Sequence, residues 1–138
     1  MEEHRLLSGG RLMLLGECAG LGDEHDNLLS MIDGWSYDVL RFRTEQDEPD
    51  DFRDLWGIFD LIAAYYLRDR IERLVAEAGS SVPSVVTAVD ELLKATFVIR
   101  EFDWLARTSQ QPGPGWWWAW LPSRGPLWKE VNEWDQPS

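Results

Sequence analysis

The fold of this chain is decided by residues 52–79, FRDLWGIFDLIAAYYLRDRIERLVAEAG. Apolar side chains recur in this stretch mainly at intervals of three and four residues: Phe52, Leu55, Trp56, Phe59, Ile62, Tyr66, Leu74 and Val75. This spacing is typical of one face of an α-helix. Pro49 and the acids that follow it suit the start of a helix, and Gly79 suits its end. The sequence therefore predicts a long helix at about residues 50–79.

A second helical pattern follows after a short link, residues 80–83. Its apolar positions are Val85, Val86, Val89, Leu92, Leu93, Phe97, Phe102 and Trp104. They predict a helix at about residues 82–107. Because a link of about four residues forces neighbouring helices to run antiparallel, we expect an αα-hairpin whose facing apolar stripes form the centre of the core.

Two further segments complete the predicted core. Residues 27–42 mostly follow helical spacing and predict an N-terminal helix, which Gly34 could interrupt. Six of the nine tryptophans lie in the last 23 residues, a density that could not stay exposed to water without aggregation. We interpret residues 116–134 as a partly extended strap across the helical hairpin, with Trp128, Val131 and Trp134 on a last helical turn.

The predicted architecture is thus a single globular domain over residues 1–138, mainly α. The alternative is an α+β fold, in which residues 12–15, 37–43 and 116–121 pair as a small sheet against the two helices. Periodicity does not separate helix from strand for residues 11–16, 36–43 and 116–121, since short apolar runs suit both.

The charge is strongly negative and unevenly distributed. Twenty-five acids against thirteen bases give −12, and residues 1–50 alone hold twelve acids and four bases, a net −8. Such a field repels nucleic acid and anionic membrane surfaces, and the apolar runs are too short to cross a bilayer. A basic partner protein is favoured instead, because complementary fields speed encounter and orient docking. Immunity proteins and antitoxins that block a basic nuclease belong to this physical class.

The densest acidic run is TEQDEPDD, residues 44–51. It lies beside the predicted helix start and is too polar to bury, so we expect its charges to be exposed and to reinforce one another. The predicted partner-binding residues are Glu45, Asp47, Glu48, Asp50 and Asp51. One of the two adjacent aspartates is also expected to cap the helix.

The sequence predicts no catalytic, cofactor or metal site. Cys18 is the single cysteine, which excludes an intramolecular disulfide and suits a reducing, cytoplasmic setting. His25 lies among Asp23, Glu24 and Asp26, but adjacent side chains cannot all face one ion, so a solvated loop that caps the next helix is favoured.

Gly16, Gly20 and Gly22 resemble the nucleotide-binding turn of the short-chain dehydrogenases over seven residues. The acids that follow them would repel a diphosphate, and that family's Tyr-x-x-x-Lys motif is missing, since Tyr66 is followed four residues later by Arg70. The sequence therefore favours a glycine-rich loop here.

Two other functions stay open: a small-ligand or regulatory binding domain with an aromatic-lined pocket, and a small enzyme of unknown chemistry. Arg68, Arg70 and Arg73 could form an anion pocket. Pairs of opposite charge four residues apart favour a solvated helix face instead: Asp69 with Arg73, Arg73 with Glu77, and Asp90 with Lys94. Asp60, the one acid inside FDLIAAYY, is expected at the polar edge of its helix or paired with an arginine.

Overall fold

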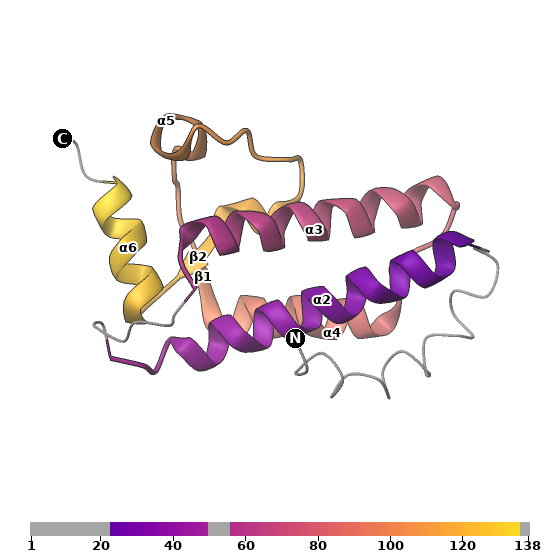
Figure 1. The fold of residues 1–138 in the computed structure, drawn as a ribbon, viewed down its shortest axis with the longest axis horizontal. Helices are drawn as coiled ribbons and strands as arrows, with labels where there is room; N and C mark the ends of the chain where they lie inside the picture. The colour runs from indigo at the N-terminus through magenta and orange to yellow at the C-terminus, as the bar shows by residue number, and fades with distance from the viewer. Residues whose placement is uncertain (1–22, 50–55, 136–138) are drawn as a thin grey trace.

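The computed structural model describes residues 23–49 and 56–135, and the side chains from residue 27 onward (Figure 1). It is mainly helical, as predicted, and it contains one antiparallel pair of short strands, whose pairing differs from the predicted alternative sheet. The elements in chain order are α2 (Asp23–Glu45), α3 (Ile58–Glu77), α4 (Ser84–Thr96), β1 (Phe97–Ile99), α5 (Trp104–Thr108), the 3-10 turn η2 (Trp116–Ala119), β2 (Trp120–Pro122) and α6 (Gly125–Asp135). The predictions for residues 11–16, Cys18 and the glycines near it lie outside the described residues.

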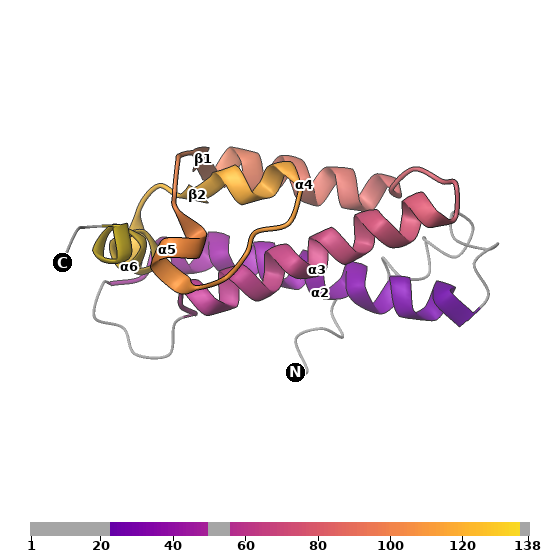
Figure 2. The same ribbon diagram turned by 90° about the horizontal axis from the view of Figure 1, so that it is seen from above.

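Three long helices form the framework. Figures 1 and 2 show α3 and α4 running antiparallel, as their short link predicts, with α2 alongside both. The principal helix contacts of α3 and of α4 are with α2, so the hairpin is not the centre of the core on its own. The buried face of α2 includes Trp35, Val39 and Phe42.

The N-terminal helix is longer than predicted and is not interrupted at Gly34. It includes residues 37–43, so the alternative in which they form a strand is wrong. The alternation in exposure that a strand requires is absent, because buried positions follow the helical period.

The predicted helix at about 50–79 begins at Ile58 in the described part of the chain, and residues 50–55 lie outside it. The backbone of Gly57 is extended, with φ −108° and ψ −169°, and this residue directly precedes the first residue of the helix. The helix stops where expected: Gly79 has φ +70°, the left-handed conformation that glycine adopts without a steric cost.

The second predicted helix, at about 82–107, is wrong as one element. It ends at Thr96, β1 follows, and α5 is separate. Phe97 is extended at φ −102° and ψ 176°, and β1 pairs antiparallel with β2, Val98 opposite Leu121. The strand pairing overrides a periodicity that Phe97 and the later aromatics would also satisfy in a helix.

The tryptophan-rich tail is part of the core. Trp117 and Trp118 expose only 2% and 6% of their surface, whereas Trp116 and Trp128 expose 36% and 40%. The tail contacts both helices of the hairpin: the Arg68 guanidinium of α3 lies 4.4 Å from the centre of the Trp117 ring, and the Lys94 ammonium of α4 lies 4.4 Å from that of Trp116. The predicted strap therefore does more than cross the two helices, because its contacts also link α3 to α4 (Figure 2).

No helix among the described residues combines the length and the apolar character needed to span a membrane.

Candidate functional site

The structure places three of the five predicted partner-binding residues. Asp47 is the most open, with 72% of its side chain exposed and an ion pair of 2.8 Å to Arg124. Glu48 is half-buried. Asp50 and Asp51 lie outside the described residues.

Glu45 differs from the expectation of an exposed loop side chain. It is the last residue of α2, exposes 15% of its side chain and forms an ion pair of 2.6 Å with Arg41. Its second oxygen accepts a hydrogen bond of 3.0 Å from the backbone N–H of Trp56. This carboxylate therefore has a structural role in joining α2 to the approach of α3.

Three carboxylates surround the start of α3. Successive backbone N–H groups of Trp56, Gly57 and Ile58 donate to Glu45, Asp60 and Glu130 at 3.0, 2.8 and 3.0 Å. These N–H groups have no acceptor within the helix and lie at the positive end of its dipole, so negative charge is stabilising there. The acceptors come from α2, α3 and α6, and the arrangement fixes the three elements to one another.

Asp60 takes the exposed position predicted for it and caps its own helix, and it pairs with no arginine among the residues that the structure describes. Sequence reasoning missed Glu130, because nothing local distinguishes it from other helix-surface glutamates. Its acceptor role depends on Ile58, 72 residues earlier in the chain.

Asp38 of α2 was also missed and belongs to the same end of the molecule. Burial, and then the negative charge of Asp60, raise the pKa of this carboxyl from 3.8 to about 7, while Arg41 acts in the opposite direction. Burial, with a smaller contribution from the charge of Asp60, therefore favours the protonated form of the Asp38 carboxyl up to near neutral pH.

We call this region the acidic end, and it lies at the left of Figure 1, where α2 ends, α3 begins and α6 packs. Two arginines, Arg41 and Arg124, pair with it. Its carboxylates are Asp38, Glu45, Asp47, Glu48, Asp60 and Glu130.

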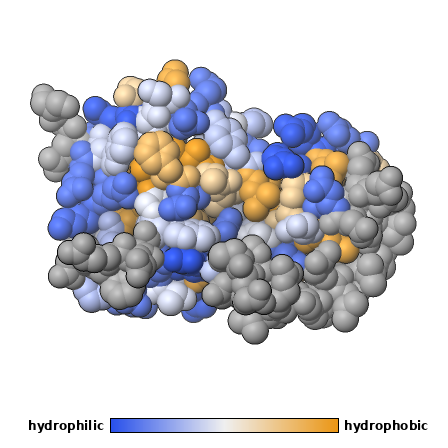
Figure 3. Space-filling model, viewed as in Figure 1, coloured by the Kyte–Doolittle hydropathy of each residue, from blue (hydrophilic) through white to orange (hydrophobic). Residues whose placement is uncertain are grey.

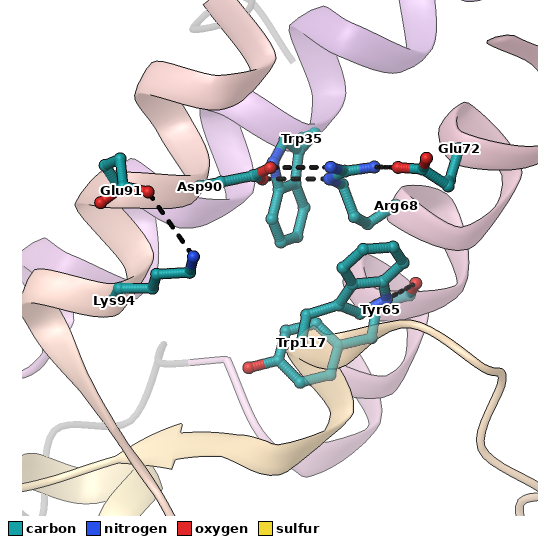
Figure 4. A network of polar contacts seen from close by, with 8 residues as sticks. All are labelled: Trp35, Tyr65, Arg68, Glu72, Asp90, Glu91, Lys94 and Trp117. Carbon is teal, nitrogen blue, oxygen red and sulfur yellow. Dashed lines mark hydrogen bonds and ion pairs between the residues drawn. The ribbon is translucent and has the colours of Figure 1, made fainter. Parts of the chain in front are cut away.

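A second polar cluster is buried between the helices (Figure 4). Arg68 forms hydrogen bonds of 3.0 and 2.7 Å with the two carboxylate oxygens of Asp90 and one of 3.0 Å with Glu72. Trp35 of α2 donates its indole N–H to the same aspartate at 3.0 Å. Burial alone would lower the pKa of the guanidinium, but these hydrogen bonds raise it above its ordinary value. The cluster joins α2, α3 and α4, with Glu72 at its exposed edge.

The expected pairing of Asp90 with Lys94 is therefore wrong. Asp90 faces the interior, and Lys94 pairs instead with Glu91 at 3.5 Å. Rules for pairs on one helix find only partners on that helix, whereas this aspartate is satisfied by α2 and α3.

Two hollows flank the segment that leads into η2. One, of about 770 Å³, includes Phe102, Trp104 and Trp116 in its lining. The other, of about 750 Å³, lies between α3 and the segment and has a largely apolar lining with Arg70 and Arg73 at its side. Both volumes are in the range of small-molecule sites.

Some large apolar side chains also reach the surface. On the face shown in Figure 3 they form a broken band between hydrophilic residues. Among the side chains that the structure describes, Ile99 is the most exposed of the large apolar ones, at 69%. Scattered exposure of this kind is ordinary in soluble domains and indicates no function by itself.

Among the residues that the structure describes, no three His, Cys, Asp or Glu side chains are placed to hold a metal ion. His25 and its acidic neighbours lie outside the described side chains. No protein-family model matches the chain, and neither the curated proteins nor the solved structures contain a match.

Proposed function

We propose that this protein is a non-enzymatic, cytoplasmic binder of a basic partner protein, of the inhibitor, immunity-protein or antitoxin type, and that the acidic end is its docking surface. The observation that carries the proposal is the gathering of five carboxylates from α2, α3, α6 and the loop after α2, with the Asp38 carboxyl beside them, against two arginines. A net charge of −12 adds long-range attraction for a basic surface.

The geometry favours docking because several of these charges are already fixed in place. Glu45, Asp60 and Glu130 are held by backbone N–H groups, so they lose little freedom when a partner binds. Asp47 and Glu48 have no such backbone role in the described structure and offer their charge to an approaching surface. A basic partner would compete with Arg124 for Asp47, an exchange that costs little because both side chains are more than half exposed.

The test is a pair of double charge reversals with the same change in net charge. The partner is obtained by affinity capture at low salt. Asp47→Lys/Glu48→Lys changes the acidic end, and Glu77→Lys/Glu101→Lys changes exposed acids outside it. Glu45 is left unchanged, because its loss would disturb the start of α3.

We expect the first double variant to associate about tenfold more slowly at low salt and to lose much of the salt dependence of the rate. The second should show only the smaller effect of net charge, and both should keep their folding stability within about 1 kcal/mol. Equal rates for the two variants would remove the acidic end as the docking surface.

A further inference from the structure

A pair of exposed arginines stands out in this acidic protein. Arg70 and Arg73 lie one turn apart on α3, both exposed, beside the hollow of about 750 Å³. Neither has an ion pair or hydrogen bond within the part of the chain that the structure describes. The expected pairs of Arg73 with Asp69 and Glu77 are not formed. We call this hollow the arginine groove.

Two acids, Asp69 and Glu72, also line the groove, but neither forms an ion pair with these arginines in the described structure. Glu72 is held by Arg68 at 3.0 Å. One oxygen of Asp69 accepts a hydrogen bond of 2.9 Å from the indole N–H of Trp118. The N–H donors of both guanidinium groups are therefore not used by any described acid and are available to a ligand.

Apart from these four charged residues, the lining is mostly apolar. Tyr66, Ala76 and Pro114 contribute to the walls, and the buried Trp117 contributes to the floor. Trp117 is fixed by its indole hydrogen bond of 3.0 Å to the carbonyl of Tyr65, and the Tyr66 hydroxyl donates to the carbonyl of Gln111. The segment that passes over α3 in Figures 1 and 2 is thus secured to that helix beside the groove.

We propose that the arginine groove binds a small amphipathic carboxylate, whose charged group pairs with Arg70 and Arg73 and whose apolar body lies against Tyr66, Ala76 and Trp117. Guanidinium groups match the planar, two-oxygen geometry of a carboxylate, and neighbouring arginines on one helix face can share one group. Burial of the apolar body supplies the remaining affinity. This site is separate from the acidic end, and neither depends on the other.

Octanoate is the probe, titrated against the full chain labelled with nitrogen-15, with the indole N–H signal of Trp117 and the side-chain N–H signals of the two arginines as the readout. 1-Octanol carries the apolar body without the charge, and acetate carries the charge without the apolar body. We expect octanoate to shift all three signals and to bind about tenfold more tightly than either control compound.

Variants locate the site. Arg70→Gln and Arg73→Gln should each weaken octanoate binding about tenfold, while Arg43→Gln, an exposed arginine of α2 away from the groove, should leave it unchanged. Ala76→Phe should block binding by filling the groove, and its spectrum reports whether the fold is kept. No shift at 10-fold excess over about 1 mM protein, equal binding of octanol or of acetate, or an equal loss in Arg43→Gln would each overturn the proposal.

Discussion

Arg68 of α3 and Asp90 of α4 form a two-point ion pair in the interior, with Nε–Oδ1 and Nη2–Oδ2 distances of 3.0 and 2.7 Å. Their side chains expose 2% and 8% of their surface. Trp35 donates to the same carboxylate, so one aspartate joins the three long helices. The face of the guanidinium also lies against Trp117, which connects the pair to the tail.

Removing only one partner of this ion pair should strongly lower the free energy of unfolding. Arg68→Ala leaves Asp90 buried with the indole N–H of Trp35 as its remaining partner, and we expect a loss of about 3–5 kcal/mol in urea denaturation. Arg73→Ala, on the exposed side of the same helix, is the matched control and should change stability by less than about 0.5 kcal/mol.

The double variant Arg68→Met/Asp90→Leu tests whether the cost comes from an uncompensated charge. It should be more stable than Arg68→Ala, because no buried carboxylate is left, although the Trp35 indole then lacks its acceptor. A double variant less stable than the single one would contradict this account.

Glu130 should matter for the start of α3 although it lies on α6. Glu130→Ala removes the acceptor for the Ile58 N–H and for the Trp134 indole, and we expect a loss of about 1–2 kcal/mol. Amide hydrogen exchange at Ile58 should quicken as well. Glu133→Ala, an exposed acid on the same helix, should change neither quantity appreciably.

The three long helices could be predicted from the sequence because each buries a stripe wide enough to dominate local periodicity. The end of α4 at Thr96 could not be predicted, because Phe97, Phe102 and Trp104 continue the helical spacing. What ends the helix is the pairing of Val98 with Leu121, a contact between distant parts of the chain that periodicity does not register.

The candidate sites likewise contain some residues that the sequence identifies and others that only the fold brings together. Composition alone pointed to the acidic run with Asp47 and Glu48, since runs of like charge are visible in the sequence. Glu130 and Asp38 join them only through tertiary contacts. Arg68 was grouped with Arg70 and Arg73, but burial separates one buried, paired arginine from two exposed, unpaired ones.

Asp38 should make the protein less stable as the pH rises towards neutrality. Its carboxyl keeps its proton to a pKa of about 7 in the folded chain but only to about 3.8 when exposed, so between these values the unfolded state binds fewer protons. Stability from this group is therefore full below pH 3.8 and falls as the pH rises through 7. Asp38→Asn should be more stable than wild type at pH 8, by on the order of 2 kcal/mol with allowance for partial exposure, and similar at pH 4. Urea denaturation at the two pH values measures the difference, and a constant difference between them would rule out this origin.

Truncation after Pro112 should leave a molten or insoluble chain. It removes Trp117, Trp118, Leu121 and Val131, none of which exposes more than 6% of its surface. At about 1.5–3 kcal/mol for each buried side chain, their loss rivals the whole stability of a typical domain, about 5–15 kcal/mol.

Two single tryptophan substitutions in the tail provide a control for the truncation. Trp128→Ala should be tolerated because this side chain is 40% exposed, whereas Trp117→Ala should cost about 3–5 kcal/mol by opening a cavity beside Arg68 and Tyr65. Near-ultraviolet circular dichroism and dye binding to exposed apolar surface distinguish a molten chain from a packed one. A truncated chain that stays soluble, keeps its near-ultraviolet signal and binds no dye would show that the helices pack without these tryptophans, and the tail would then have to be regarded as a binding surface.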